Sequence, residues 1–141
     1  YGTEEHVQLF MKRPEMNACT DGLLGGKPHP RVYGAFPRIL GKYVREDKAL
    51  TLEEAVYKMT KKPATAFNMT DRGELREGAY ADITIFNPET VIDKGTFTDP
   101  IQYPEGIEYV MINGELVVKN GAHTGVRNGV VLRKKGKEVV K

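Results

Sequence analysis

The sequence predicts an α/β chain whose first half is mostly helical, with one short strand, and whose second half is built of β-strands. Two patterns indicate this division. Before residue 71, apolar residues recur at steps of three and four, which is the spacing of one helical face. After residue 73, glycines separate short runs of β-branched residues, as in strands joined by turns. At 141 residues, the chain has the length of one ordinary domain.

Two helices are expected early in the chain. Residues 3–12 form the first, because Thr3 is a suitable N-cap and Pro14 follows the last turn. Residues 32–46 carry a single apolar stripe and form the second, which the chain enters around Pro37.

A third and a fourth helix are indicated by local signals. Thr51 followed three residues later by Glu54 is a capping-box pattern, in which each side chain binds the other residue's backbone N–H. Pro63 is suited to the first turn of a helix and opens a short helical stretch over residues 64–68.

One strand is expected among these helices. Residues 16–20 form a short run of small and apolar residues that meets the charge of Asp21. A strand over residues 16–21 would therefore present Asp21 at its C-terminal end. Residues 22–30 are rich in Gly and Pro, and we expect them to form the loop that leaves this strand.

The strands of the second half are marked by alternation and turns. Residues 80–86 alternate apolar and polar side chains, as a half-buried strand does. Asn113-Gly114 lies between the strand-like runs 109–112 and 115–118, and an Asn-Gly pair in this setting predicts a β-hairpin.

Composition excludes several classes of protein. Lys and Arg number 21 and Asp and Glu 19, so the net charge of +2 lacks the basic excess of a nucleic-acid-binding protein. No apolar run approaches the roughly 20 residues that span a bilayer, which argues against a membrane protein. One cysteine cannot form an intrachain disulfide. We expect no nucleic-acid or membrane partner, and a cytoplasmic location.

Asp21 is the first candidate site residue. A carboxylate at the end of a strand, followed by a Gly-rich loop, lies at the sheet edge where α/β folds place their sites. Such a group ligates a metal or takes a proton from water. The alternative is a structural role as a helix cap or Asx-turn residue, and the residues alone leave both open.

Arg31 and His29 are the next candidates. They lie in the sequence Pro28-His29-Pro30-Arg31, where two prolines stiffen the loop. Arginine is suited to gripping a carboxylate with two parallel hydrogen bonds. The alternative is an ordinary solvated surface loop.

The remaining His and Cys residues do not form a metal-binding pattern. We interpret Cys19 as a small buried apolar residue, and His6 and His123 as surface or packing residues. The chain has no His-x-His, Cys-x-x-Cys or His-Glu-x-x-His motif, and no phosphate-binding or dinucleotide-binding loop. If Asp21 is catalytic, the rest of its site lies on other polypeptide.

Several short motifs together resemble the C-terminal part of N-acyl-D-amino-acid deacylases (D-aminoacylases), a branch of the amidohydrolase superfamily. The likeness includes Asp21-Gly22 and Pro28-His29-Pro30-Arg31. The deacylase branch is suggested by His29-Pro30-Arg31 and by Gln102-Tyr103-Pro104-Glu105-Gly106-Ile107, while Gly78-Ala79-Tyr80-Ala81-Asp82 indicates an amidohydrolase in general. Further matching motifs are Tyr33-Gly34, Phe36-Pro37-Arg38, Leu40-Gly41-Lys42-Tyr43, Leu52-Glu53-Glu54-Ala55-Val56, Lys58-Met59-Thr60, Asp71-Arg72-Gly73, Phe97, Asp99-Pro100, Asn113-Gly114 and His123-Thr124-Gly125. The likeness extends to about residue 133.

The resemblance implies the C-terminal part of a zinc-dependent hydrolase built on a (β/α)₈ TIM barrel with a small accessory β-sandwich domain. Residues 1–70 would be the end of the barrel, with its last strand at residues 16–21 and the helices that close it. Residues 71–133 would be strands of the accessory domain. Residues 134–141 would be a basic, solvated tail.

The resemblance also implies roles for the site residues. Asp21 matches the aspartate that activates metal-bound water and then protonates the leaving amine, and it is at most a weak metal ligand. Arg31 matches the arginine that binds the substrate carboxylate, and His29, beside it in the motif, is a substrate-binding candidate with a loop-shaping or secondary role. The expected substrate is a small N-acyl-D-amino acid. Zn²⁺ would be bound by the full-length enzyme and not by this chain alone.

The chain is therefore expected to need the rest of the barrel and to be inactive by itself. Two rival interpretations stay open at this stage: a non-catalytic β assembly or binding domain with Asp21 as a turn residue, and a cyclic amidase of the hydantoinase or dihydroorotase kind. The sequence leaves the oligomeric state, the substrate's acyl group and side chain, and the number of zinc ions undetermined.

Overall fold

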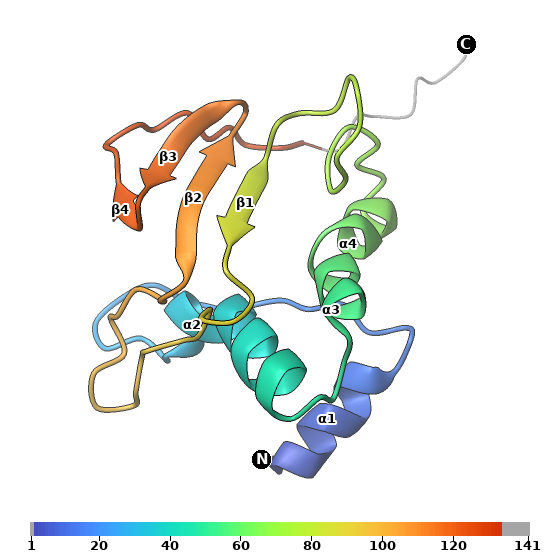
Figure 1. Cartoon of the computed structure of the whole chain (residues 1–141), viewed down its shortest axis with the longest axis vertical. Coiled ribbons are helices and arrows are strands. Elements are labelled where there is room, and N and C mark those ends of the chain that lie inside the picture. Colours follow the sequence, from blue (N-terminus) through green and yellow to red (C-terminus); the bar gives the residue numbers. More distant parts are fainter. Residues whose placement is uncertain (1, 134–141) are drawn as a thin grey trace.

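The computed structural model describes residues 2–133, with helices in the first half of the chain and an antiparallel sheet in the second (Figure 1). The helices are α1 (Glu4–Lys12), α2 (Arg31–Arg38), the π-helix η1 (Ile39–Glu46), α3 (Leu52–Met59) and α4 (Lys61–Ala66). The strands are β1 (Ile83–Phe86), β2 (Ile107–Ile112), β3 (Glu115–Lys119) and β4 (Ala122–His123). No helix in residues 2–133 is long and apolar enough to cross a lipid bilayer.

Two predicted helix N-termini are confirmed, the one capped by Thr3 and the one capped by Thr51. Thr51 accepts a hydrogen bond from the backbone N–H of Glu54 at 3.2 Å, and Glu54 accepts one from the N–H of Thr51 at 2.9 Å, which completes the capping box of α3. At α1, Thr3 caps the N–H of His6, whose Nδ1 accepts in return from the N–H of Thr3. The exposed His6 thus takes the place that Glu or Gln usually fills.

The second predicted helix is in fact two. A π-helix follows directly on α2, and its wide turns bring the N–H of Asp47 to the carbonyl of Lys42 at 2.7 Å. Gly41 lets this helix pack against backbone, since a Cβ there would lie 2.6 Å from the carbonyl oxygen of Val91. The side chain of Arg45 donates to the same oxygen at 2.7 Å. The π-helix is therefore fastened to the segment around Val91.

The predicted helix at Pro63 begins two residues earlier than expected. Because α4 starts at Lys61, Pro63 occupies the first turn, where its missing N–H costs no hydrogen bond. The helix ends at Ala66, and Asn68, two residues further on, has a left-handed φ of 57°.

The sheet has the order β1-β2-β3-β4, and each neighbouring pair is antiparallel. The predicted hairpin is confirmed: Asn113 and Gly114 join β2 to β3 with φ angles of 50° and 84°, as a two-residue turn with two left-handed positions requires. The strand predicted over residues 80–86 is shorter, because only 83–86 pair with β2. The two-residue β4 has no counterpart among the predictions.

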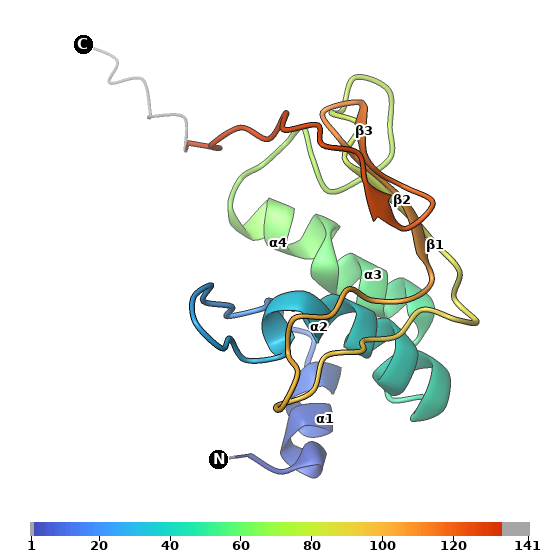
Figure 2. The same cartoon turned by 90° about the vertical axis from the view of Figure 1, so that its left-hand side faces the viewer.

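The core lies between the helices and the segment that connects β1 to β2. Its buried residues are Leu40, Leu50, Ala55 and Val91, and Phe86 and Ile107 of the sheet pack against them from the strand ends. Figures 1 and 2 show α3 and α4 beside the sheet and α1 at the end of the molecule farthest from it. The sheet thus joins the core chiefly through one end.

The strand predicted over residues 16–21 is not formed. These residues belong to no strand, and Ala18 makes a backbone hydrogen bond with a helix instead, donating to the carbonyl of Lys58 at 3.1 Å. A strand needs a neighbouring strand to pair its N–H and C=O groups, and the only sheet within residues 2–133 consists of β1 to β4. The segment is fixed by helices instead.

Candidate functional site

Asp21 ends the extended segment and begins the Gly-rich loop. Its φ of 45° lies in the left-handed region, which Asp tolerates better than most residues. Its side chain is 78% exposed, and the neighbouring Thr20 hydroxyl accepts a hydrogen bond from the N–H of Gly22 at 3.3 Å. Asp21 is thus a turn residue by its backbone, while its carboxylate is free to meet another group.

That group is Arg31, the first residue of α2. Its Nη2 lies 2.7 Å from Oδ2 of Asp21, and its Nε donates to the backbone carbonyl of Asp21 at 3.0 Å. The structure therefore brings together two of the three predicted site residues, which are ten positions apart in sequence. An exposed pair of this kind contributes only about 0–1 kcal/mol. A competing anion therefore meets little resistance at the guanidinium.

His29 shapes the loop that carries Arg31. Its Nδ1 accepts a hydrogen bond from the backbone N–H of Arg31 at 3.1 Å. Its ring meets the ring of Phe97 edge to face, with centroids 5.0 Å apart. These contacts link His29 to the start of α2 and to the segment between β1 and β2.

Two aromatic residues beside the site were not among the candidates. The segment between β1 and β2 returns to the start of α2, where Phe97 meets His29 and Tyr103 meets Tyr33 at 6.0 Å. Both Phe97 and Tyr103 are more than two-thirds exposed. Their positions in the family motifs were visible in the sequence, but only the fold places them near Arg31.

Cys19 was predicted to be a buried apolar residue, and this was wrong. Its side chain is exposed, because the segment around it lacks the neighbouring strands that would cover it. His123 lies in β4, where its Nδ1 accepts from the N–H of Gly125 at 2.9 Å. Among residues 2–133, no three His, Cys, Asp or Glu side chains gather in a way that could hold a metal ion.

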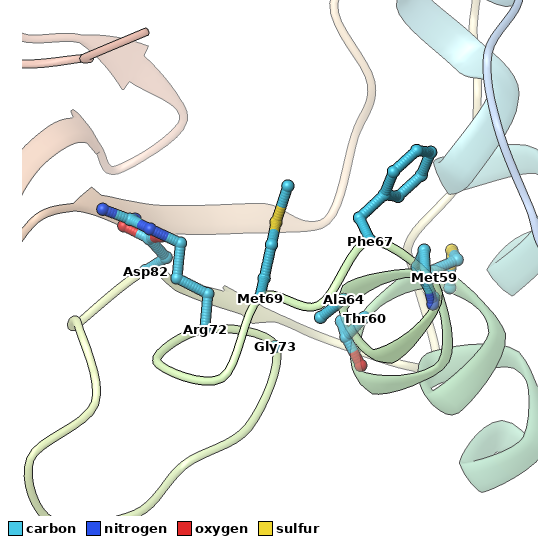
Figure 3. A pocket seen from close by; sticks show the side chains of 9 residues that line it. Met59, Thr60, Ala64, Phe67, Met69, Arg72, Gly73 and Asp82 are labelled. Carbon is cyan, nitrogen blue, oxygen red and sulfur yellow. The ribbon is translucent and has the colours of Figure 1, made fainter. Parts of the chain in front are cut away.

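Two cavities of the described chain lie away from Asp21. One, of about 310 Å³, opens between the α3–α4 helices and the start of β1, and Figure 3 shows Phe67 and Met59 on one side of it and Arg72 and Asp82 on the other. Arg72 pairs with Asp82, donates to Oδ1 of Asn113 at 2.7 Å and stacks over the Tyr80 ring at 4.1 Å. A second cavity, of about 200 Å³, lies beside η1. Neither is lined by Asp21, His29 or Arg31.

A comparison with protein-family models shows to which family the chain belongs. A model described as the amidohydrolase family matches residues 20–118, a span that includes Asp21, Arg31 and most of the sheet. The chain belongs to this family. Within this family, the chain is similar to deacylases and to dihydroorotases.

Similarity to deacylases is high along the chain. The N-acyl-D-glutamate deacylase of Alcaligenes xylosoxydans xylosoxydans is 47% identical over 132 residues, which is 93% of this chain and 27% of that protein. A dihydroorotase of Lactobacillus acidophilus is 36% identical over 121 residues, 78% of this chain and 27% of that enzyme. The chain thus spans about a quarter of the length of the curated relatives it matches.

Two solved structures share the fold. The N-acyl-D-glutamate deacylase of Bordetella bronchiseptica, solved with zinc and a phosphonate inhibitor that mimics the tetrahedral intermediate, is 42% identical with a TM-score of 0.80, over 82% of this chain and 24% of that one. A D-aminoacylase is 39% identical with a TM-score of 0.85, over 88% of this chain and 26% of that one. The α/β arrangement of this amidohydrolase piece therefore matches part of a D-aminoacylase.

The residues at hand do not make a zinc site. Asp21 is ion-paired with Arg31, and no further His, Cys, Asp or Glu side chain within residues 2–133 joins it in a group that could hold a metal. A zinc ion, which the Bordetella enzyme contains, would need ligands from outside this stretch. We therefore assign no chemical step to a metal held by this chain.

Proposed function

We propose that this chain is the C-terminal section of a longer amidohydrolase that cleaves the amide bond of N-acyl-D-amino acids to give a carboxylate and a free D-amino acid. The observation that carries the proposal is the 2.7 Å contact between Asp21 and Arg31. The contact supports the proposal, because a carboxylate is able to accept a proton and a guanidinium is able to bind a substrate carboxylate. The 47% identity with an N-acyl-D-glutamate deacylase supports the choice of substrate class.

The two residues divide the chemistry between them. Arg31 turns part of its guanidinium from Asp21 to the carboxylate of the acyl amino acid, while its Nε hydrogen bond to the Asp21 carbonyl keeps the side chain in place. Asp21 accepts a proton from the water that adds to the acyl carbon. It then returns this proton to the nitrogen as the C–N bond breaks. The exposed position of Asp21 leaves room for the rest of the site to close over it.

The proposal is tested by substituting Asp21→Asn in the longer protein and measuring turnover of N-acetyl-D-amino acids in the presence of zinc. Loss of the base should lower kcat by about 10²–10⁴-fold, with a small change in KM. Arg31→Gln should instead act mainly on KM, because it removes binding of the carboxylate. Arg13→Gln is the matched control, since within residues 2–133 the salt bridge of the Arg13 side chain is made with the exposed Glu15 alone.

The isolated 141-residue chain gives a second readout. It should show no turnover, because its described residues complete no metal site and Asp21 lines neither of the two cavities described above. Robust hydrolysis by the isolated chain would contradict the proposal.

Two rivals have specific support. The partly exposed apolar side chains Ile85 and Leu116 of the sheet favour a non-catalytic assembly or binding domain, and unchanged turnover in Asp21→Asn would support it. The 36% identity with a dihydroorotase favours a cyclic amidase. Faster cleavage of hydantoin or dihydroorotate rings than of N-acyl-D-amino acids would identify that activity.

A further inference from the structure

A buried lysine lies behind the segment that carries Asp21. Lys58, in the last turn of α3, is only 8% exposed. Its ammonium group donates to the backbone carbonyls of Arg13 at 2.5 Å and Met16 at 3.3 Å. Among residues 2–133 it makes no salt bridge with a carboxylate. Since a buried charge is costly unless it is hydrogen-bonded, these two carbonyls are what hold the ammonium in its position.

Lys58 also contacts the segment through its backbone. Its carbonyl accepts the 3.1 Å hydrogen bond from the N–H of Ala18, so one residue binds the segment at three points. One helical turn further on, Lys62 donates to the carbonyl of Glu15 at 2.8 Å. In the absence of a paired strand at residues 16–21, these bonds fix the course of the chain into Asp21.

Arg31 is held by different contacts. It begins α2, which continues into η1, and η1 is fastened to the backbone around Val91. The carboxylate and the guanidinium therefore approach each other from two separately anchored elements. The bonds made by Lys58 set the position of only one of them.

We propose that Lys58 is a positioning residue that fixes the Asp21 carboxylate for proton transfer by holding residues 13–18 against α3. This inference rests on the proposed function, since it assumes that Asp21 is the base. Loss of the ammonium leaves the carbonyls of Arg13 and Met16 without their donor, and the segment then shifts. A displacement on the order of 1 Å at a reacting group lowers the rate by about 100-fold.

The test is Lys58→Met in the longer protein, assayed on N-acetyl-D-amino acids at a temperature where circular dichroism shows the variant folded. We expect kcat to fall about 10- to 100-fold and KM to change less, because the backbone of Arg31 is anchored in α2, although its Nε bond to the Asp21 carbonyl links the side chain to the segment. Lys58→Arg keeps the charge and the donors and should recover most of the lost kcat. Lys61→Met is the matched control, since Lys61 is nearby on α4 and pairs with Glu74. If Lys58→Met does not fold, Lys58→Gln is read in the same way.

A double substitution separates positioning from a general effect on structure. If Lys58 acts through Asp21, Lys58→Met should change turnover less than about twofold in a protein that already carries Asp21→Asn. An equal fractional loss in both backgrounds, an unchanged kcat in a folded Lys58→Met protein, or a rise in KM alone would each overturn the inference. Unchanged turnover in Asp21→Asn by itself overturns the proposed function as well, so the two failures are distinguishable.

Discussion

The helical region and the sheet differ in how far they cover their own apolar residues. Ala55 of α3 and Val91, which packs against the helices, have no exposed surface. In the sheet, Ile85 is 51% and Leu116 37% exposed. The core cluster is built by the other helices and the segment that returns across them, since α1 has no buried residue, whereas in strands β1 to β4 Val117 alone is buried. In a chain that spans about a quarter of its relatives, we expect other polypeptide to cover the sheet.

The largest effect is expected where the two regions meet, at Gly106. A Cβ at this position would lie 2.5 Å from the backbone nitrogen of Val91, and its φ of 77° disfavours any other residue. Gly106→Ala should therefore lower the free energy of unfolding by about 3 kcal/mol or more, since backbone must move in addition to the conformational cost. Chemical denaturation of the longer protein measures this.

Gly114→Ala is the control for Gly106. Gly114 has a similar φ of 84°, but a Cβ there would meet no atom within 4 Å. It should cost only about 1–2 kcal/mol, which is the conformational part alone. Equal losses at the two positions would show that the contact with Val91 is unimportant.

A smaller loss of stability is expected when an apolar side chain is truncated to alanine, and the size of this loss can be compared between the two regions. Val91→Ala should cost about 2 kcal/mol, because it leaves a void in a fully buried site. Ile85→Ala should cost less than about 1 kcal/mol if the sheet stays half exposed, and about 3 kcal/mol if other polypeptide covers it. Denaturation midpoints of the two variants in the longer protein distinguish these cases, and a small loss at Ile85 contradicts a covered sheet.

The smallest effect on stability is expected at Glu74, in the segment that links α4 to β1. Hydrogen bonds from Lys61 and from Arg76, both at 2.8 Å, lower the pKa of Glu74 in the folded chain. A carboxyl whose pKa falls on folding contributes stability above its ordinary pKa, and this stability is lost as the pH falls through the folded value. Glu74→Gln should therefore lower the melting temperature slightly near neutral pH.

The difference between Glu74→Gln and the unsubstituted protein should vanish in acid. Glu77→Gln serves as the control, because the Glu77 carboxylate makes no salt bridge within the described part of the chain. A melting-temperature difference for Glu74→Gln that stays constant down to strongly acidic pH would show that the ion pairs do not cause it. Added salt should reduce the effect, since the pairs are partly exposed.

Local signals allowed much of this fold to be predicted. Thr51 and Glu54 interact across one helical turn, and Asn113 and Gly114 adopt left-handed angles that Asn and Gly tolerate. Each feature is therefore readable from a few adjacent residues. The predictions that were wrong depend on contacts between residues far apart in the sequence. The strand at residues 16–21 and the burial of Cys19 both needed neighbouring strands that the chain does not supply.

In the candidate site, too, the residue types could be predicted from the sequence, whereas the contacts between them could not. Sequence motifs identified Asp21, His29 and Arg31 as residue types suited to proton transfer and to carboxylate binding, because that chemistry belongs to the side chains themselves. Tertiary structure decided that Arg31 reaches Asp21, that Phe97 meets His29, and that Lys58 anchors the approach to Asp21. These contacts depend on how separate elements pack, and packing distances between residues far apart in the chain are not encoded in any short stretch of it.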